Sequence, residues 1–244
     1  MKKADKRRIF ALLIVVLTVT LGITGYTYIN NGYAASDAAL AVMAGAETVC
    51  VYEPTENMVV FAAEEPAAGM VFYPGGKVEH TAYAPLMQAL AEAGITCVLT
   101  EMPFDLAVLD VDAAQRAREA VTGIERWYIG GHSLGGAMAA NYAAAHPDEY
   151  DGLILLAAYS TKDLKYSGLK VVSLYGTEDK ILNREKYEKY WENLPENAVE
   201  LVLDGGNHAQ FGSYGPQDGD GTARVSAEKQ TAWTAEIISS EILG

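Results

Sequence analysis

The chain has 244 residues, half of which are hydrophobic, and its formal net charge is −14 at neutral pH. Beyond the N-terminal segment about 200 residues remain, which suits one domain with an ample core. The acidic balance argues against nucleic acid or an anionic membrane surface as a ligand, and it disfavours acidic substrates.

The N-terminal segment predicts a membrane anchor. Five cations lie within the first eight residues, and residues 9–29 carry no charge. A stretch of this length spans a bilayer of about 30 Å, with its basic flank in the cytoplasm. The alternative is a secretory signal cleaved after Ala34, but the apolar run exceeds the about 7 to 15 residues of a signal core. We therefore expect residues 1–8 in the cytoplasm, an uncleaved signal anchor, a linker at 30–46 and an extracytoplasmic domain at 47–244.

Strand and helix patterns alternate along this domain. Residues 48–52 and 58–62 predict two strands joined by a turn-rich connection, as in an antiparallel hairpin. Further strands are expected at 69–73, 95–100, 126–129, 152–157, 169–175 and 198–203, and helices at 83–93, 112–121, 137–145, 187–194 and 225–243. This alternation predicts an α/β fold with a mostly parallel sheet that helices cover on both faces.

The most informative motif is Gly131-His-Ser-Leu-Gly135, which matches Gly-x-Ser-x-Gly. A β-rich run precedes it and an alanine-rich helix former follows it, so Ser133 lies on a strand-to-helix turn. Such a turn strains the serine backbone and exposes its hydroxyl, while the glycines let strand and helix approach closely. The pentapeptide alone also fits a glycine-rich turn with a capping serine. The flanking pattern favours a nucleophile.

A serine nucleophile needs a base that a third group orients, and both candidates follow in the chain. The seventh expected strand ends in Gly-Thr-Glu-Asp, which places Asp179 in the turn after it. The last strand precedes Asp-Gly-Gly-Asn-His, which ends at His208. We expect Ser133, Asp179 and His208 to form a catalytic triad, with Glu178 and Asp204 as alternatives for the acid.

Stabilising a tetrahedral oxyanion requires two fixed N–H donors. One belongs to the residue after the nucleophile, which is Leu134, and the other lies in the loop after the third strand. That loop reads Pro74-Gly-Gly-Lys77, which also fits an ordinary connection. Its position favours Gly76 as the second donor, with Lys77 as the alternative.

The other three histidines are interpreted as structural. His132 occupies the variable position of the elbow and points away from the Ser133 hydroxyl, His146 ends the helix after the elbow, and His80 lies near an earlier helix. The histidines and cysteines lack the spacing of zinc ligands, and the expected mechanism needs no metal or cofactor.

Together these motifs resemble the α/β-hydrolase family, and specifically its small, lid-poor branch of dienelactone-hydrolase-like and short-chain esterase proteins. The resemblance covers about residues 47–243 and rests on residues 72–77, 131–135, 176–179 and 205–212. It implies an eight-stranded sheet and an acyl-enzyme mechanism. Two positions depart from the family. Ser133 stands where dienelactone hydrolases proper use cysteine, which disfavours their substrate, and Pro74 stands where many relatives carry histidine.

The resemblance also bears on the cysteines and the loops. Its strand order places Cys50 and Cys97 in non-adjacent strands, so we expect two buried thiols and no disulfide. Only residues 158–169 separate the sixth and seventh strands, so no substantial lid is expected over the site. Residues 102–109 are either an apolar wall of the site or a loop packed on the core. For residues 211–221 we expect a solvated loop that could form a rim of the pocket, and no calcium site.

The sequence therefore predicts a membrane-anchored serine hydrolase that cleaves a small carboxylic ester. The same triad also serves thioesterases, lactonases, peptidases and transacylases. A non-catalytic binding module of the cell envelope is a further alternative. The sequence assigns no substrate-binding residues.

Overall fold

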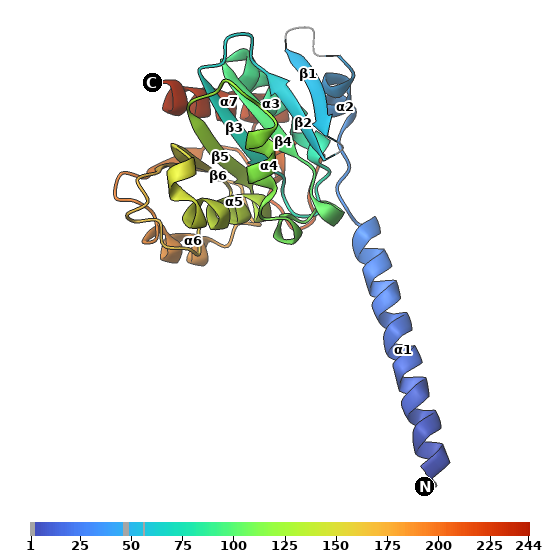
Figure 1. Ribbon diagram of the computed structural model, residues 1–244. Helices are drawn as coiled ribbons and strands as arrows, with labels where there is room; N and C mark the ends of the chain where they lie inside the picture. The colour runs from blue at the N-terminus through green and yellow to red at the C-terminus, as the bar shows by residue number, and fades with distance from the viewer. Residues whose placement is uncertain (1–2, 46–48, 56) are drawn as a thin grey trace. The chain divides into compact units, whose positions relative to one another are not determined.

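The computed structural model describes residues 3–45, 49–55 and 57–244, without the side chains at 3–6, 8, 11, 29 and 30. The described residues up to Gly32 form one compact unit, and those from Tyr33 to Gly244 form a second. Helix α1 (Lys3–Asn30) makes up most of the first unit (Figure 1).

The structure does not support the predicted transmembrane helix. Over the described part of the chain, no helix is both long enough and apolar enough to cross a bilayer. The predicted location of the domain outside the cytoplasm stays a prediction.

The second unit begins at Tyr33. The sequence predicted that the domain starts at residue 47, which lies outside the described residues. Helix α2 (Asp37–Ala44) occupies the region expected to be a linker. The Ser36 side chain accepts the Ala39 N–H as an N-cap, and Ala39 is fully buried. The backbone of Tyr33 also forms a β-bridge with Val78. This segment is therefore part of the folded domain.

The sheet has eight strands: β1 (Cys50–Thr55), β2 (Met58–Ala62), β3 (Ala68–Tyr73), β4 (Ile95–Thr100), β5 (Trp127–His132), β6 (Gly152–Leu156), β7 (Lys170–Gly176) and β8 (Val199–Leu203). Their spatial order is β1-β2-β4-β3-β5-β6-β7-β8. Strand β2 pairs antiparallel with β1 and β4, and all other pairs are parallel. The predicted hairpin and the mostly parallel sheet are confirmed.

The edge strand β1 differs from its prediction. It continues through Pro54 to Thr55, which pairs with Met58, because an edge strand tolerates a residue without an N–H. Its exposed position also corrects the expectation for Cys50, whose thiol is exposed, whereas Cys97 in β4 is buried. Both thiols are free, and β2 lies between their strands.

Five further helices flank the sheet: α3 (Ala84–Glu92), α4 (Ala113–Glu119), α5 (Leu134–Ala145), α6 (Arg184–Trp191) and α7 (Ala227–Leu243). Helices α3 and α7 pack on one face of the sheet, and side chains of α2 also pack there. Helices α4 and α5 pack on the other face, where Trp191 of α6 adds a further contact (Figure 1). Every residue of β3 and β4 is buried. Such strands read as continuous apolar runs because both of their faces are covered.

The parallel strands place the candidate residues at one edge of the sheet. Strand β5 ends one residue before Ser133, β7 ends shortly before Asp179, and β8 shortly before His208. The carboxyl ends of parallel strands in an open sheet are where ligands bind. Residues 157–169, between β6 and β7, form no helix or strand, in line with the expectation that no substantial lid covers this edge.

Candidate active site

Ser133 lies on a strained elbow between β5 and α5. Its backbone has φ 52° and ψ −120°, a region that residues with side chains rarely adopt. The Ser133 N–H donates to the Leu156 carbonyl of β6 at 2.9 Å, which anchors the turn to the sheet. A Cβ on Gly135 would lie 2.2 Å from the Pro74 oxygen, so only glycine fits there. The strand-turn-helix context predicted from the sequence is present.

His208 and Asp179 meet in a buried pair. Nδ1 of His208 lies 2.8 Å from Oδ2 of Asp179, and His208 is 1% exposed. The other carboxylate oxygen, Oδ1, accepts the N–H groups of Ile181 and Leu182 at 2.9 and 2.8 Å. Because Asp179 accepts at Nδ1, the ring proton of a neutral His208 is on Nδ1 and leaves Nε2 as a base.

The free nitrogen of His208 belongs to the same cavity as Ser133. Nε2 is buried and makes no hydrogen bond to any described residue, and both His208 and Ser133 line a cavity of about 350 Å³. Catalytic hydrogen bonds are often open before substrate binds. The arrangement therefore provides a base without a competing partner beside a serine hydroxyl.

The two alternative acids lie elsewhere. Glu178 accepts from Nε of Arg224 at 2.8 Å, and Asp204 accepts from Nη2 of the same guanidinium at 2.7 Å. Arg224 therefore holds both carboxylates at the surface, and the acid that the structure brings to His208 is Asp179.

The loop after β3 lies against the start of α5. A Cβ on Gly76 would be 3.0 Å from Cδ2 of Leu134, so the two residues are close. The Lys77 N–H donates to the Asp105 carbonyl and the Gly75 N–H to the Tyr83 hydroxyl, each at 2.9 Å. No described residue accepts the Gly76 N–H, and Leu134, as the first residue of α5, has no helical acceptor for its N–H. Gly76 and Leu134 thus offer two free donors, and the alternative donor Lys77 is engaged.

The remaining histidines make contacts away from the Ser133 hydroxyl. His132 is buried, with Nδ1 2.8 Å from the Tyr83 hydroxyl. Burial holds the pKa of His132 well below its ordinary value; the neighbouring His208 acts in the same direction, and the His208 backbone carbonyl opposes it. His146 stacks on Tyr142 and bonds to Glu149, and His80 begins a turn before α3.

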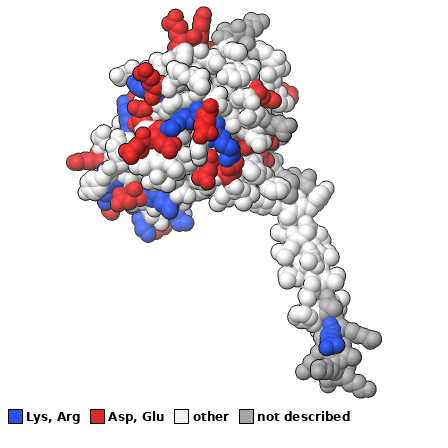
Figure 2. Space-filling view, viewed as in Figure 1, with Lys and Arg blue, Asp and Glu red and all other residues white. Residues whose placement is uncertain are grey.

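The cavity beside Ser133 provides candidate binding residues, which the sequence did not assign. Besides Ser133, Leu134 and His208, its lining consists of Ala137, Met138, Ala157, Ala158, Tyr159, Thr161, Ile181, Leu182 and Asn183. None of these carries a formal charge, whereas charged side chains are interspersed over the outer surface (Figure 2). Their only sequence signal is their place just after β6, after Asp179 or in the first turns of α5.

The two loops discussed from the sequence agree with part of what was expected of them. No residue of 102–109 lines this cavity. Met102 and Ala107 are buried in the core, which supports the alternative of a loop packed on the core, while Phe104, Val108 and Leu109 are exposed. Residues 211–221 are solvated in their middle, where Gly215, Pro216, Asp218 and Gly219 are exposed, and are held by contacts on either side. The Asp220 carboxylate accepts the N–H groups of Ala209 and Lys180, and Tyr214 is buried. Within the described ranges, no three acidic, histidine or cysteine side chains gather as a metal site would require.

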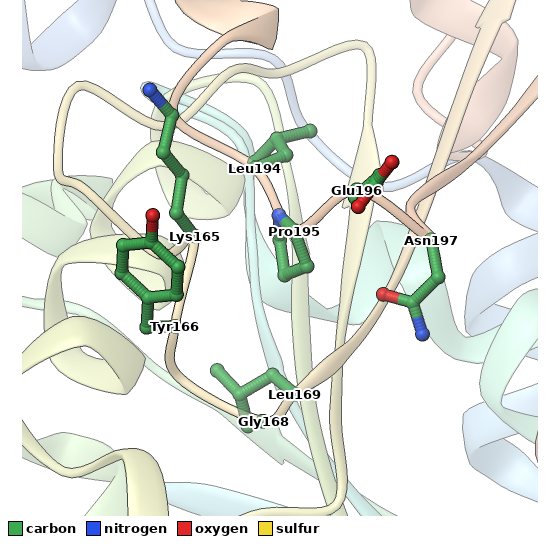
Figure 3. A pocket seen from close by; sticks show the side chains of 8 residues that line it. All are labelled: Lys165, Tyr166, Gly168, Leu169, Leu194, Pro195, Glu196 and Asn197. Atoms are coloured by element: carbon green, nitrogen blue, oxygen red, sulfur yellow. The ribbon is translucent and has the colours of Figure 1, made fainter.

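A larger cavity, of about 670 Å³, lies elsewhere. Figure 3 shows its lining, with Lys165 and Tyr166 on one side and Leu194, Pro195 and Asn197 on the other. These residues precede β7 and β8, so this cavity lies at the amino-terminal edge of the sheet. It holds none of the candidate catalytic residues, so the larger volume does not coincide with the candidate active site.

Comparisons with known proteins agree with this architecture. The alpha/beta hydrolase family matches residues 69–232. No curated protein matches the sequence. Similar solved structures include TT1662 from Thermus thermophilus (15% identity, TM-score 0.59, 80% of this chain and 99% of the other). Est1E from Butyrivibrio proteoclasticus has 13% identity, TM-score 0.57 and coverages of 81% and 100%. A monoacylglycerol lipase from Paleococcus ferrophilus has 16% identity, TM-score 0.57 and coverages of 79% and 99%.

Proposed function

Because this chain belongs to the alpha/beta hydrolase family, we propose that it is a serine hydrolase that cleaves carboxylic esters. The observation that carries the proposal is the pairing of His208 with Asp179 at 2.8 Å, which leaves Nε2 of His208 free in the cavity that Ser133 lines. The esterase and lipase names among the similar structures support the same class of reaction.

In the proposed reaction, Oγ of Ser133 attacks the ester carbonyl carbon while Nε2 of His208 takes the hydroxyl proton. The N–H groups of Gly76 and Leu134 stabilise the oxyanion of the tetrahedral intermediate. His208 then returns the proton to the alcohol as the carbon–oxygen bond breaks, which leaves an acyl-enzyme. Water, deprotonated by His208, attacks that acyl group in the same way and releases the acid and Ser133.

The cavity supports small, uncharged substrates. Apolar contacts from Met138 and Leu182 suit an acyl or alcohol group, while Tyr159, Thr161 and Asn183 bring polar atoms without charge. A cavity of about 350 Å³ is at the small end of ligand sites. We therefore propose short neutral esters as the substrate class.

The test is intact-mass analysis of the full-length protein after treatment with a fluorophosphonate, together with turnover of a short aryl ester. We expect one adduct on the wild type and none on Ser133→Ala, with turnover lower by several orders of magnitude and the fold unchanged. Ser239→Ala is the matched control, because the buried Ser239 hydroxyl has no partner among the described residues; it should label like the wild type.

Labelling of Ser133→Ala, or unchanged turnover by it, would refute the proposal, and an unlabelled wild type would favour a binding module. Parallel assays with a thioester and an amide of the same acyl group separate ester cleavage from the other reactions of such a triad.

A further inference from the structure

A buried tyrosine lies behind the candidate active site and contacts two of its parts. Tyr83 ends the turn His80–Tyr83 before α3 and is fully buried. Its hydroxyl lies 2.9 Å from the Gly75 nitrogen and 2.8 Å from Nδ1 of His132. Gly75 precedes the proposed donor Gly76, and His132 precedes the nucleophile Ser133.

The direction of these hydrogen bonds is assigned from the need of a buried O–H group for an acceptor. The Gly75 N–H donates to the Tyr83 oxygen. Among the described residues Nδ1 of His132 is the acceptor within reach of the buried Tyr83 O–H, so we assign the O–H as its donor, which puts the ring proton of His132 on Nε2. Burial raises the pKa of Tyr83 and lowers that of His132. Both groups therefore stay neutral around neutral pH, and the pattern of donors and acceptors does not change there.

The loop at residues 74–77 lies directly against the side chains of Tyr83 and His132. A Cβ on Gly75 would be 2.8 Å from the Tyr83 hydroxyl oxygen and 2.9 Å from Nδ1 of His132. Both side chains therefore support the backbone that leads into Gly76.

The histidine of the pair also supports the base. The centroids of the His132 and His208 rings are 4.5 Å apart, and His132 lies 5.6 Å from the Phe211 ring. One side of His208 is thus held by Asp179 through a hydrogen bond, and a ring face is held by His132 through packing.

We propose that Tyr83 and His132 are positioning residues for ester cleavage. They hold the loop at residues 74–77, here called the oxyanion loop, and the His208 ring in the correct positions relative to each other. This inference rests on the proposed function. Neither residue lines the cavity, so neither touches substrate. Their effect is on geometry, and misplacement of a catalytic group by 1 Å costs about 100-fold in rate.

The test is Tyr83→Phe in the full-length protein, which removes one oxygen atom and leaves the Gly75 N–H without its acceptor. We expect kcat for a short aryl ester to fall by about 10- to 100-fold, with KM within about twofold of wild type, because the substrate contacts remain.

Tyr73→Phe is the matched control. The Tyr73 hydroxyl is also buried and also accepts a backbone N–H, from Ala114 at 2.7 Å, while it donates to the Val111 carbonyl. Both variants should lose similar thermal stability, and only Tyr83→Phe should lose kcat. His132→Asn is a second variant that keeps an acceptor near Tyr83 but removes the ring beside His208, and it too should lower kcat.

A thionoester of the same acyl group identifies the step that is affected. Sulfur accepts hydrogen bonds weakly, so a displaced oxyanion loop should slow Tyr83→Phe more with the ester than with the thionoester. If Tyr83→Phe retains wild-type kcat, or if Tyr73→Phe loses as much, the inference is overturned. Fluorophosphonate labelling separates the two proposals: an unlabelled wild type overturns the proposed function, whereas a labelled wild type with unimpaired Tyr83→Phe overturns this inference alone.

Discussion

Asp179 uses its two oxygens for different purposes. One accepts from His208, and the other accepts two backbone N–H groups of the turn that follows, at Ile181 and Leu182. The turn therefore fixes the carboxylate independently of the histidine. The same turn brings Ile181 and Leu182 to the cavity wall, so the orientation of the acid and the shape of the cavity depend on the same few residues.

Because the two carboxylate oxygens have different partners, Asp179→Asn should affect them differently. The amide oxygen can still accept from the turn, but the amide N–H₂ facing His208 favours the ring tautomer with the proton on Nε2, which cannot act as the base. We expect kcat to fall by about 10⁴-fold with little loss of stability. Steady-state kinetics and thermal unfolding check this. A variant that unfolds, or that keeps more than about a tenth of the activity, would contradict it.

His132 makes the stability of the fold sensitive to acid. Burial holds its pKa well below the ordinary 6.5, so below pH 6.5 the unfolded chain binds a proton that the folded chain does not. This lowers the free energy of unfolding as pH falls, with a slope approaching about 1.4 kcal/mol per pH unit, until the folded pKa is reached. Urea unfolding at several pH values between about 7 and 5.5 measures this change in the free energy of unfolding.

His132→Asn provides the comparison, because His208 and Tyr83, the titratable groups that contact His132 among the described residues, are present in both proteins. We expect the variant to lose less stability over this range than the wild type. Equal losses would show that His132 is not the group responsible.

At the scale of elements, the elbow depends on backbone contact between β3 and α5. Because a Cβ on Gly135 would lie 2.2 Å from the Pro74 oxygen, we expect Gly135→Ala to lower the free energy of unfolding by about 2 to 3 kcal/mol or to prevent folding. Gly45→Ala adds the same methyl where no atom of the described residues lies within 4 Å and φ is 170°. That variant should differ from the wild type by less than about 1 kcal/mol. Urea unfolding measures the stability of both variants. If Gly135→Ala and Gly45→Ala were equally stable, close contact between Gly135 and Pro74 could not be the cause.

The sequence predicted the strands better than the segments that depend on distant contacts. Buried parallel strands are continuous apolar runs, so β3, β4 and β7 were found within one or two residues. Strand β5 runs on to His132 because β6 pairs with it up to Leu156, through glycines that weaken a strand signal. Helix α2 was missed because it has only eight residues, and because its packing partners lie far away in the chain.

In the candidate site, too, some residues could be predicted from local sequence patterns and others could not. Ser133, Asp179 and His208 each follow a recognisable strand end, so local pattern places them. Tyr83 has no local signal, since its importance comes from Gly75 and His132 across the fold. The cavity lining likewise exists only after the strand ends meet.

At the scale of the whole molecule, charge and cavity act differently on a substrate. The net charge of −14 acts at long range, while the residues that line the cavity beside Ser133 carry no charge. We expect kcat/KM for an anionic ester to rise by about three- to tenfold between low salt and physiological ionic strength, and that of a cationic ester to fall. A neutral ester of the same shape should change little. A common trend for all three, in kinetics at several salt concentrations, would contradict steering by net charge.

The separation of the two edges of the sheet also matters for how the protein can be handled. Tyr166 is 97% exposed beside the larger cavity at the amino-terminal edge, and the seven residues of β7 separate that edge from Asp179 by roughly 20 Å. A cysteine introduced at Tyr166 would therefore carry a fluorophore, or a linker to a solid support, on the side remote from the proposed chemistry. Substrate would still enter freely, and the immobilised protein would present its working edge to the solution.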